Sequence, residues 1–152
     1  MAAVARATGP CHGKSTRPAR RARSGALCLV NAARAAARLR ALRGDSRLTR
    51  AATAQARDMA RRHYFAHQRS GGPSLSARLR ARGYRAGYVG EAIAWGCGTL
   101  ATPAATVRAW LASPPHRAIL LSRAFKRAGI GFARGPVACA GGALWVLDAG
   151  NR

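Results

Sequence analysis

Acidic residues are scarce in this 152-residue chain, which has 4 of them against 27 lysines and arginines and carries a formal net charge of +23. So few carboxylates, spread along the chain, cannot supply the clustered oxygen ligands of a calcium or magnesium site. Aromatic residues are also few, at 6%, so the core must consist mainly of Ala, Leu, Val and Ile. Hydrophobic residues make up 49%, which is enough for a packed core and excludes a wholly disordered chain.

The signatures of several functional classes are missing. The longest uncharged run, residues 92–107, is too short for a transmembrane helix and contains glycine and proline. Neither a Walker A phosphate loop nor a GxGxxG motif is present, so nothing indicates nucleotide chemistry. The four cysteines include no CxxC pair, which argues against a zinc ribbon or a thioredoxin-like redox site.

The positive charge has two interpretations. Ala, Arg, Gly and Pro, which have G/C-rich codons, are all abundant, and a G/C-rich genome places arginine on protein surfaces without selection for binding. The basic residues form no single stripe and are not interleaved with aromatic residues that could stack on bases. We therefore expect nonspecific attraction to polyanions that weakens steeply with salt. A dedicated nucleic-acid-binding protein is the alternative function.

The chain divides into a tail and one domain. Residues 1–24 have two prolines, a basic cluster and no apolar periodicity, which predicts a disordered basic tail and leaves residues 25–152 as the folded domain. The start of the chain does not read as a secretory signal, because Asn31 and Arg34 interrupt the apolar stretch that follows the basic residues.

Within the domain, helices come first and strands come late. Apolar periodicity predicts helices over residues 24–44, from residue 45 or 46 to the segment 63–67, and over 74–83 and 102–113, followed by a short turn at 116–121. Residues 129–133 and 143–148 are predicted strands, and residues 88–95 are an irregular strand or a buried loop. This order, without a regular βαβ repeat, predicts a mixed α/β class with helices packed on a small sheet.

Few polar side chains are candidates for chemistry, and Glu91 stands out among them. It is the only glutamate and lies in the apolar stretch 89–95. A buried carboxylate is costly unless it is paired, so Glu91 needs a cationic or hydrogen-bonding partner. Two interpretations stay open: a functional contact with a histidine, or a structural role in which Glu91 accepts hydrogen bonds from backbone amides of the following loop.

The remaining candidates are His63, His67, His116, Asp58 and Asp148. His67 follows an aromatic pair at a predicted helix end, and His116 follows two prolines that restrict the backbone. His63 is interpreted as a surface residue, and Asp58 as a helix-surface ion-pair partner of Arg61 or Arg62. The three tryptophans, Trp95, Trp110 and Trp145, are assigned to the core or to a cleft wall.

Six segments carry a family resemblance: YFAH, RLRARGY, GEAIAWG, AWLASPPHRAIL, GIGFA and WVLDAG, in this order over residues 27–150. Their order and spacing resemble the bacterial branch of the CAP superfamily, which comprises the cysteine-rich secretory proteins, antigen 5 and the pathogenesis-related proteins and is also called the SCP domain. The resemblance implies a three-layer α-β-α sandwich at an extracellular or cell-envelope location. It also implies a central cleft where two histidines and two acids can hold a divalent metal such as zinc.

Carried over residue by residue, the resemblance places His67, Glu91 and His116 in that cleft, with the two histidines as candidate metal ligands. The second acid of the family pattern falls on Ala77 in this sequence. Three further positions depart from the pattern: Ala92, Pro115 and Ile119. We therefore expect weak zinc binding and no required cofactor.

The function expected from these residues is that of a monomeric binding module at the cell envelope. Its cleft ligand would be an anionic envelope polymer or a lipid. No catalytic apparatus is visible, because Ser113, although near His116, is followed by prolines and lies on no nucleophile elbow. Two histidine ligands are also fewer than the three protein ligands typical of a catalytic zinc site.

The four cysteines, Cys11, Cys28, Cys97 and Cys139, allow three disulfide pairings. Cys97 and Cys139 lie in loop-like segments late in the chain, which favours a bridge between them. Cys28 lies within a helical apolar pattern, where a buried free thiol is equally compatible with the sequence.

Overall fold

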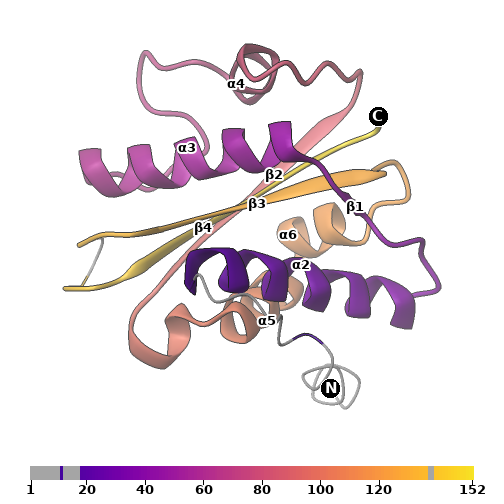
Figure 1. The fold of residues 1–152 in the computed structure, drawn as a ribbon, viewed down its shortest axis with the longest axis horizontal. Helices are drawn as coiled ribbons and strands as arrows, with labels where there is room; N and C mark the ends of the chain where they lie inside the picture. Colours follow the sequence, from indigo (N-terminus) through magenta and orange to yellow (C-terminus); the bar gives the residue numbers. More distant parts are fainter. Residues whose placement is uncertain (1–10, 12–17, 137–138) are drawn as a thin grey trace.

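The structure, a computed structural model, describes residues 11, 18–136 and 139–152. Helices lie on both faces of a four-stranded sheet (Figure 1). The elements are α2 (Pro18–Ala36), β1 (Arg43–Gly44), α3 (Ser46–Arg62), α4 (Leu75–Ala81), β2 (Val89–Gly96), the 3-10 helix η1 (Gly98–Ala101), α5 (Pro103–Ala112), α6 (Pro114–Leu120), β3 (Arg127–Arg134) and β4 (Ala143–Gly150). This architecture confirms the predicted α-β-α sandwich. None of the described helices is long and apolar enough to cross a membrane.

The strand order in the sheet is β1-β3-β4-β2, with β2 and β3 antiparallel to β4 and β1 parallel to β3. Every residue of β4 is buried, as expected for a strand covered on both faces. Its side chains alternate between two cores: Leu144 and Val146 pack with α3, whereas Trp145 and Leu147 pack with α2 and α5.

Two glycines of β3 allow α3 to lie directly on the sheet. A Cβ atom on Gly129 would overlap the α3 backbone at Thr49, and one on Gly131 would overlap it at Ala52. Gly129 is the cross-strand neighbour of Asp148, so that acid lies in the closely packed layer beneath α3.

The first helix differs from its prediction at both ends. It begins at Pro18 rather than Ser24, so residues 18–24 are helical and not part of a disordered tail. Proline is favoured in the first turn of a helix because its missing N–H needs no partner there. The other residues of the predicted tail, apart from Cys11, lie outside the described residues. The helix ends at Ala36 because Arg38 adopts the left-handed conformation.

The two polar residues that interrupt the first apolar stretch hold the chain around the end of α2. The Asn31 side chain exchanges two hydrogen bonds with the backbone of Leu42. The guanidinium of Arg34, which is 2% exposed, donates to the carbonyls of Leu120 and Ser122. These two side chains therefore pair with backbone groups of the segment after α2 and of the C-terminal end of α6.

Two further segments are more regular than predicted. Residues 89–96 form an ordinary strand, β2, rather than a buried loop. The turn predicted at 116–121 is largely helix α6, with two prolines in its first turn. The predictions for α3, α4 and α5 are confirmed, with side chains of Asp45, Ser74 and Thr102 capping their N-termini.

Two disulfides join the four cysteines. The predicted bridge between Cys97 and Cys139 is confirmed. The alternative of a free thiol at Cys28 is wrong, because Cys28 is bonded to Cys11, which is itself buried. The apolar pattern around Cys28 predicts its helix, but it does not indicate that Cys28 pairs with Cys11 in the preceding segment.

Candidate functional site

Glu91 is the centre of the polar cluster. It lies on β2, an outer strand of the sheet, and is 4% exposed. Its Oε1 atom is 2.9 Å from His67 Nδ1, and its Oε2 atom accepts a hydrogen bond from Arg78 Nη2 at 2.8 Å. The prediction that Glu91 has a cationic or hydrogen-bonding partner is thus confirmed, and the partners are an imidazole and a guanidinium. The alternative, in which Glu91 accepts hydrogen bonds from backbone amides of the following loop, is wrong.

The loop after α3 carries His67, and two neighbouring elements fix its backbone. Gln55 on α3 donates to the carbonyls of Ala66 and His67, at 3.1 and 3.4 Å. Arg78 on α4 donates to the His67 carbonyl at 2.9 Å. One guanidinium therefore holds both the carboxylate and the loop, which sets where the imidazole meets Glu91.

Asp148 provides a second carboxyl beside Glu91. The two residues are cross-strand partners on β4 and β2, and Asp148 is fully buried. Neither of its carboxyl oxygens meets hydrogen-bond geometry with a described residue. Burial, and next the negative charge of Glu91, raise the pKa of Asp148 well above its usual value. Asp148 therefore keeps its proton to a higher pH than an ordinary aspartate, which avoids two adjacent buried charges.

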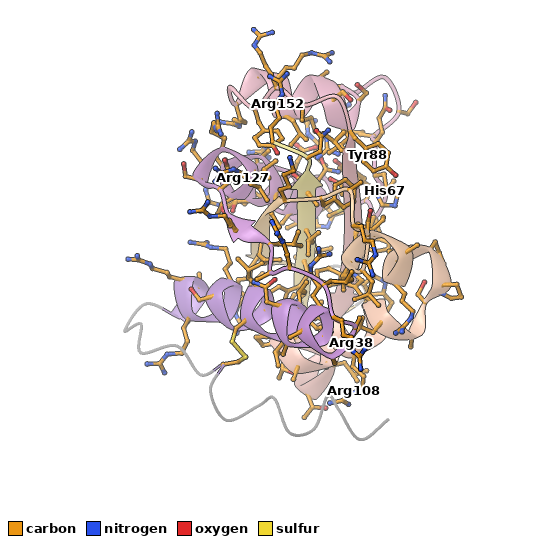
Figure 2. The ribbon with its side chains drawn as sticks, turned by 90° about the vertical axis from the view of Figure 1, so that its right-hand side faces the viewer. Arg38, His67, Tyr88, Arg108, Arg127 and Arg152 are labelled. Carbon is orange, nitrogen blue, oxygen red and sulfur yellow. A yellow bond between two sulfur atoms is a disulfide. The ribbon has the colours of Figure 1, made fainter. Side chains whose placement is uncertain are left out.

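His116 comes from the other face of β2, and no described hydrogen bond or ion pair joins it to Glu91 or His67. It lies on α6, which packs on β2 through Ile119 next to Gly90. Its Nδ1 atom is 3.0 Å from the Ser113 hydroxyl oxygen. Burial, and to a smaller extent the charge of His67, lower the pKa of His116. In Figure 2 His67 lies on the same side of the molecule as α6, the helix that carries His116.

Both rings make their described hydrogen bond through Nδ1. A neutral His67 that donates from Nδ1 to Glu91 leaves a lone pair on Nε2, which is the arrangement of a metal-binding histidine oriented by a carboxylate. Within residues 11, 18–136 and 139–152, no group of three His, Cys, Asp or Glu side chains could hold a metal ion.

Neither His63 nor Asp58 forms a described hydrogen bond or ion pair with Glu91, His67 or His116. His63 is exposed and ends α3, as predicted. Asp58 pairs with Arg61 and Arg62 at 3.2 and 2.9 Å, also as predicted. Among the tryptophans, Trp110 and Trp145 are buried, whereas Trp95 is 48% exposed and is not a core residue.

Sequence reasoning missed Arg78 and Gln55. Arg78 belongs to the RLRARGY segment and directly follows Ala77, the position where the family pattern has an acid. The sequence did contain a signal for Arg78, because a buried glutamate needs a cation and this arginine lies in a segment of the family pattern. Gln55 gave no signal beyond being a polar residue on the apolar face of α3.

Comparisons with known proteins bear on the family and on the fold. Residues 27–148 match the family model CAP, described as the cysteine-rich secretory protein family. The chain is 32% identical over 118 residues to the protein YkwD of Bacillus subtilis (strain 168), covering 78% of this chain and 42% of that protein.

Two solved bacterial structures share the fold. The first is an extracellular protein containing an SCP domain from Bacillus anthracis str. Ames, with a TM-score of 0.76 and 22% identity over 92% of this chain and 45% of that chain. The second is an outer surface protein from Borrelia burgdorferi, with a TM-score of 0.67 and 21% identity over 83% of this chain and 89% of that chain. The chain thus spans less than half the length of YkwD and of the B. anthracis protein.

Proposed function

The chain belongs to the CAP family of cysteine-rich secretory proteins, and from this premise we propose that it is an extracellular, envelope-associated binding module whose ligand cleft is lined by His67, Glu91 and His116. The contact between Glu91 and His67 carries the proposal. The carboxylate side chain is 2% exposed, whereas the imidazole that it orients is 56% exposed. A buried carboxylate that holds an exposed imidazole in one orientation makes that imidazole ready to bind a ligand from solvent.

An extracellular location is supported by two observations. The structural neighbours include proteins described as extracellular or as outer surface proteins. The chain has two disulfides and no free cysteine among its described residues. Disulfides persist in oxidising compartments and are rare in reducing ones.

A divalent ion such as zinc fits this cleft as a weakly held ligand. The Nε2 atoms of His67 and His116 would bind it, and Glu91 would act on it through His67. A bound ion would supply positive charge for an anionic ligand. Two imidazoles are fewer than the four ligands of a structural zinc site or the three of a catalytic one. The fit is therefore to an exchangeable ion.

Zinc titration by calorimetry tests the cleft. We expect His67→Ala and His116→Ala each to abolish binding, because each removes one of two donors. Binding should weaken as pH falls below about 6.5, where protons compete for imidazole nitrogen. The lowered pKa of His116 means that its contribution persists to lower pH than that of an ordinary histidine.

The matched control for this titration is His63→Asn, because His63 adopts the left-handed conformation that asparagine tolerates. This variant should bind zinc as the unsubstituted protein does. A protein that releases no heat with zinc, or a His63→Asn variant that loses binding equally, would contradict the metal assignment.

The partner that we propose is an anionic envelope polymer, because the positive surface charge is largely unopposed. Each acid is engaged or buried: Asp45 with Arg47, Asp58 with Arg61 and Arg62, Glu91 with Arg78, and Asp148 beneath α3. With a net charge of +23, the protein is attracted to phosphodiester polymers in general.

A salt titration tests the nucleic-acid alternative. We expect poly(glycerol phosphate) and duplex DNA to bind with similar affinities that fall together as salt rises, because charge without a groove-reading element ignores sequence. Fluorescence anisotropy with several labelled duplexes measures this. A sequence preference that survives physiological salt would favour the nucleic-acid alternative.

A further inference from the structure

On its outer side, β3 pairs with β1 over only a short part of its length. The two-residue strand β1 pairs only with Arg127 and Ala128. Among the described residues, the segment 129–134 has no strand partner on that side. At about 3.4 Å per residue, this open edge is roughly 20 Å long.

The alternation of the backbone shows which groups face this edge. The β1 segment donates hydrogen bonds to the carbonyls of Lys126 and Ala128. In an extended strand, every second residue directs its N–H and C=O groups to the same side. Ile130, Phe132 and Arg134 therefore direct their backbone donors and acceptors to the open edge.

A groove follows the last part of this edge, between α2 and α3, which lie on opposite faces of the sheet (Figure 1). Its volume is about 410 Å³, and its lining is Ala19, Ala22, Arg57, Phe132, Ala133 and Arg134. The short alanines of α2 leave room beside the strand, and the half-buried Phe132 supplies apolar surface. The groove thus combines an unpaired strand edge with an apolar wall.

Two exposed arginines flank the groove. Arg57 projects from α3, and Arg134 lies at the end of β3 with its guanidinium 5.6 Å from the centre of the Phe132 ring. Neither arginine forms a salt bridge with an acid in the described part of the chain. The charge of the groove is therefore complementary to carboxylates.

We propose that this groove binds an extended acidic peptide segment of a partner protein, which adds to the sheet as a strand beside β3. The peptide backbone would pair with the open groups of Ile130, Phe132 and Arg134, as in other cases of strand addition. Alternate apolar side chains would contact Phe132, carboxylates between them would pair with Arg57 on the α3 face, and a carboxylate at the end of the peptide would pair with Arg134 at the end of β3. A purely apolar ligand would leave the strand edge and both guanidiniums unused.

This surface is separate from the histidine cluster. It lies at the β3 edge, whereas His67 contacts β2 at the other edge of the sheet. Figure 2 shows His67 and Arg127 of β3 well apart across the molecule. Substitutions in one site can therefore be tested without changing the other.

Fluorescence anisotropy with the full chain tests the proposal. The probes are labelled heptapeptides that alternate glutamate with valine, isoleucine or threonine, and matched peptides with lysine in place of glutamate. We expect saturable binding of an acidic peptide and none of the lysine peptides. Arg57→Glu and Arg134→Glu should each weaken binding by about tenfold or more, since each replaces a charge-assisted pair with repulsion.

The matched control is Arg108→Glu, which changes the net charge equally at an exposed position on α5 and should leave binding within about twofold. Peptides methylated on alternate backbone nitrogens test the strand pairing. One of the two methylation patterns should abolish binding and the other should preserve it, because only alternate amides face β3.

Three results would overturn the proposal. The first is that no acidic peptide binds, including a case in which only an apolar ligand such as oleate occupies the groove. The second is that Arg108→Glu weakens binding as much as Arg57→Glu and Arg134→Glu do. In that case the net charge of the protein alone would account for the binding. The third is that both methylation patterns bind as well as the unmodified peptide.

Discussion

Replacing Arg78 by methionine is expected to lower the free energy of unfolding by about 3–5 kcal/mol, because it leaves an uncompensated charge in the protein interior. The Glu91 side chain is 2% exposed and Arg78 is 12% exposed, so water cannot replace the lost guanidinium. Methionine fills much of the same apolar volume, which limits the effect to the polar contacts. Urea unfolding followed by circular dichroism measures the difference.

Two further variants isolate the cause. Arg80→Met removes an exposed arginine from the same helix and should change stability by less than about 0.5 kcal/mol. The double variant Arg78→Met/Glu91→Gln replaces the buried charge with a neutral amide and should recover most of the loss. If Arg78→Met and Arg80→Met lower the free energy of unfolding equally, Arg78 does not stabilise the buried carboxylate of Glu91.

Removing the Cys97–Cys139 disulfide by replacing both cysteines with alanine is expected to lower the free energy of unfolding by about 4 kcal/mol. The bridge closes a loop with a sequence separation of 42, which restricts the unfolded chain strongly. It also joins the end of β2 to the connection between β3 and β4. The free end of β2 should therefore show faster amide hydrogen exchange in the variant.

The second disulfide is the internal control. Cys11–Cys28 has a sequence separation of 17, for which loop closure gives about 3 kcal/mol. Guanidinium unfolding of both double-alanine variants should rank the Cys97–Cys139 bridge as the more stabilising. A larger loss from the Cys11–Cys28 variant would show that contacts of the N-terminal segment outweigh loop length.

Local signals in the sequence were sufficient for the helices with side-chain caps. Asp45, Ser74 and Thr102 each precede an apolar periodic segment, and each accepts hydrogen bonds from the first turn of its helix. Helix α2 has no such signal, and its apolar pattern continues past Ala36 into a segment that is not helical. Its true end depends on the backbone conformation of Arg38, which an arginine residue does not reveal.

The site was predictable in kind and not in detail. Burial of the only glutamate required a cation or donor, and the family resemblance indicated His67, which the 2.9 Å contact confirms. Arg78 could not be identified, because its contact with Glu91 depends on how α4 lies against β2. The role of Asp148 depends on the register between β2 and β4, which periodicity alone does not determine.

The central claim is that His67, Glu91 and His116 form one ligand site. Imidazole nitrogen NMR of the labelled protein during a zinc titration at mildly alkaline pH tests it most directly. Before zinc is added, His67 should carry its proton on Nδ1, facing Glu91. On addition of zinc, the Nε2 signals of His67 and His116 should shift together with one midpoint, while those of His63 stay unchanged. Separate midpoints for the two rings, or a response of only one of them, would contradict a shared site.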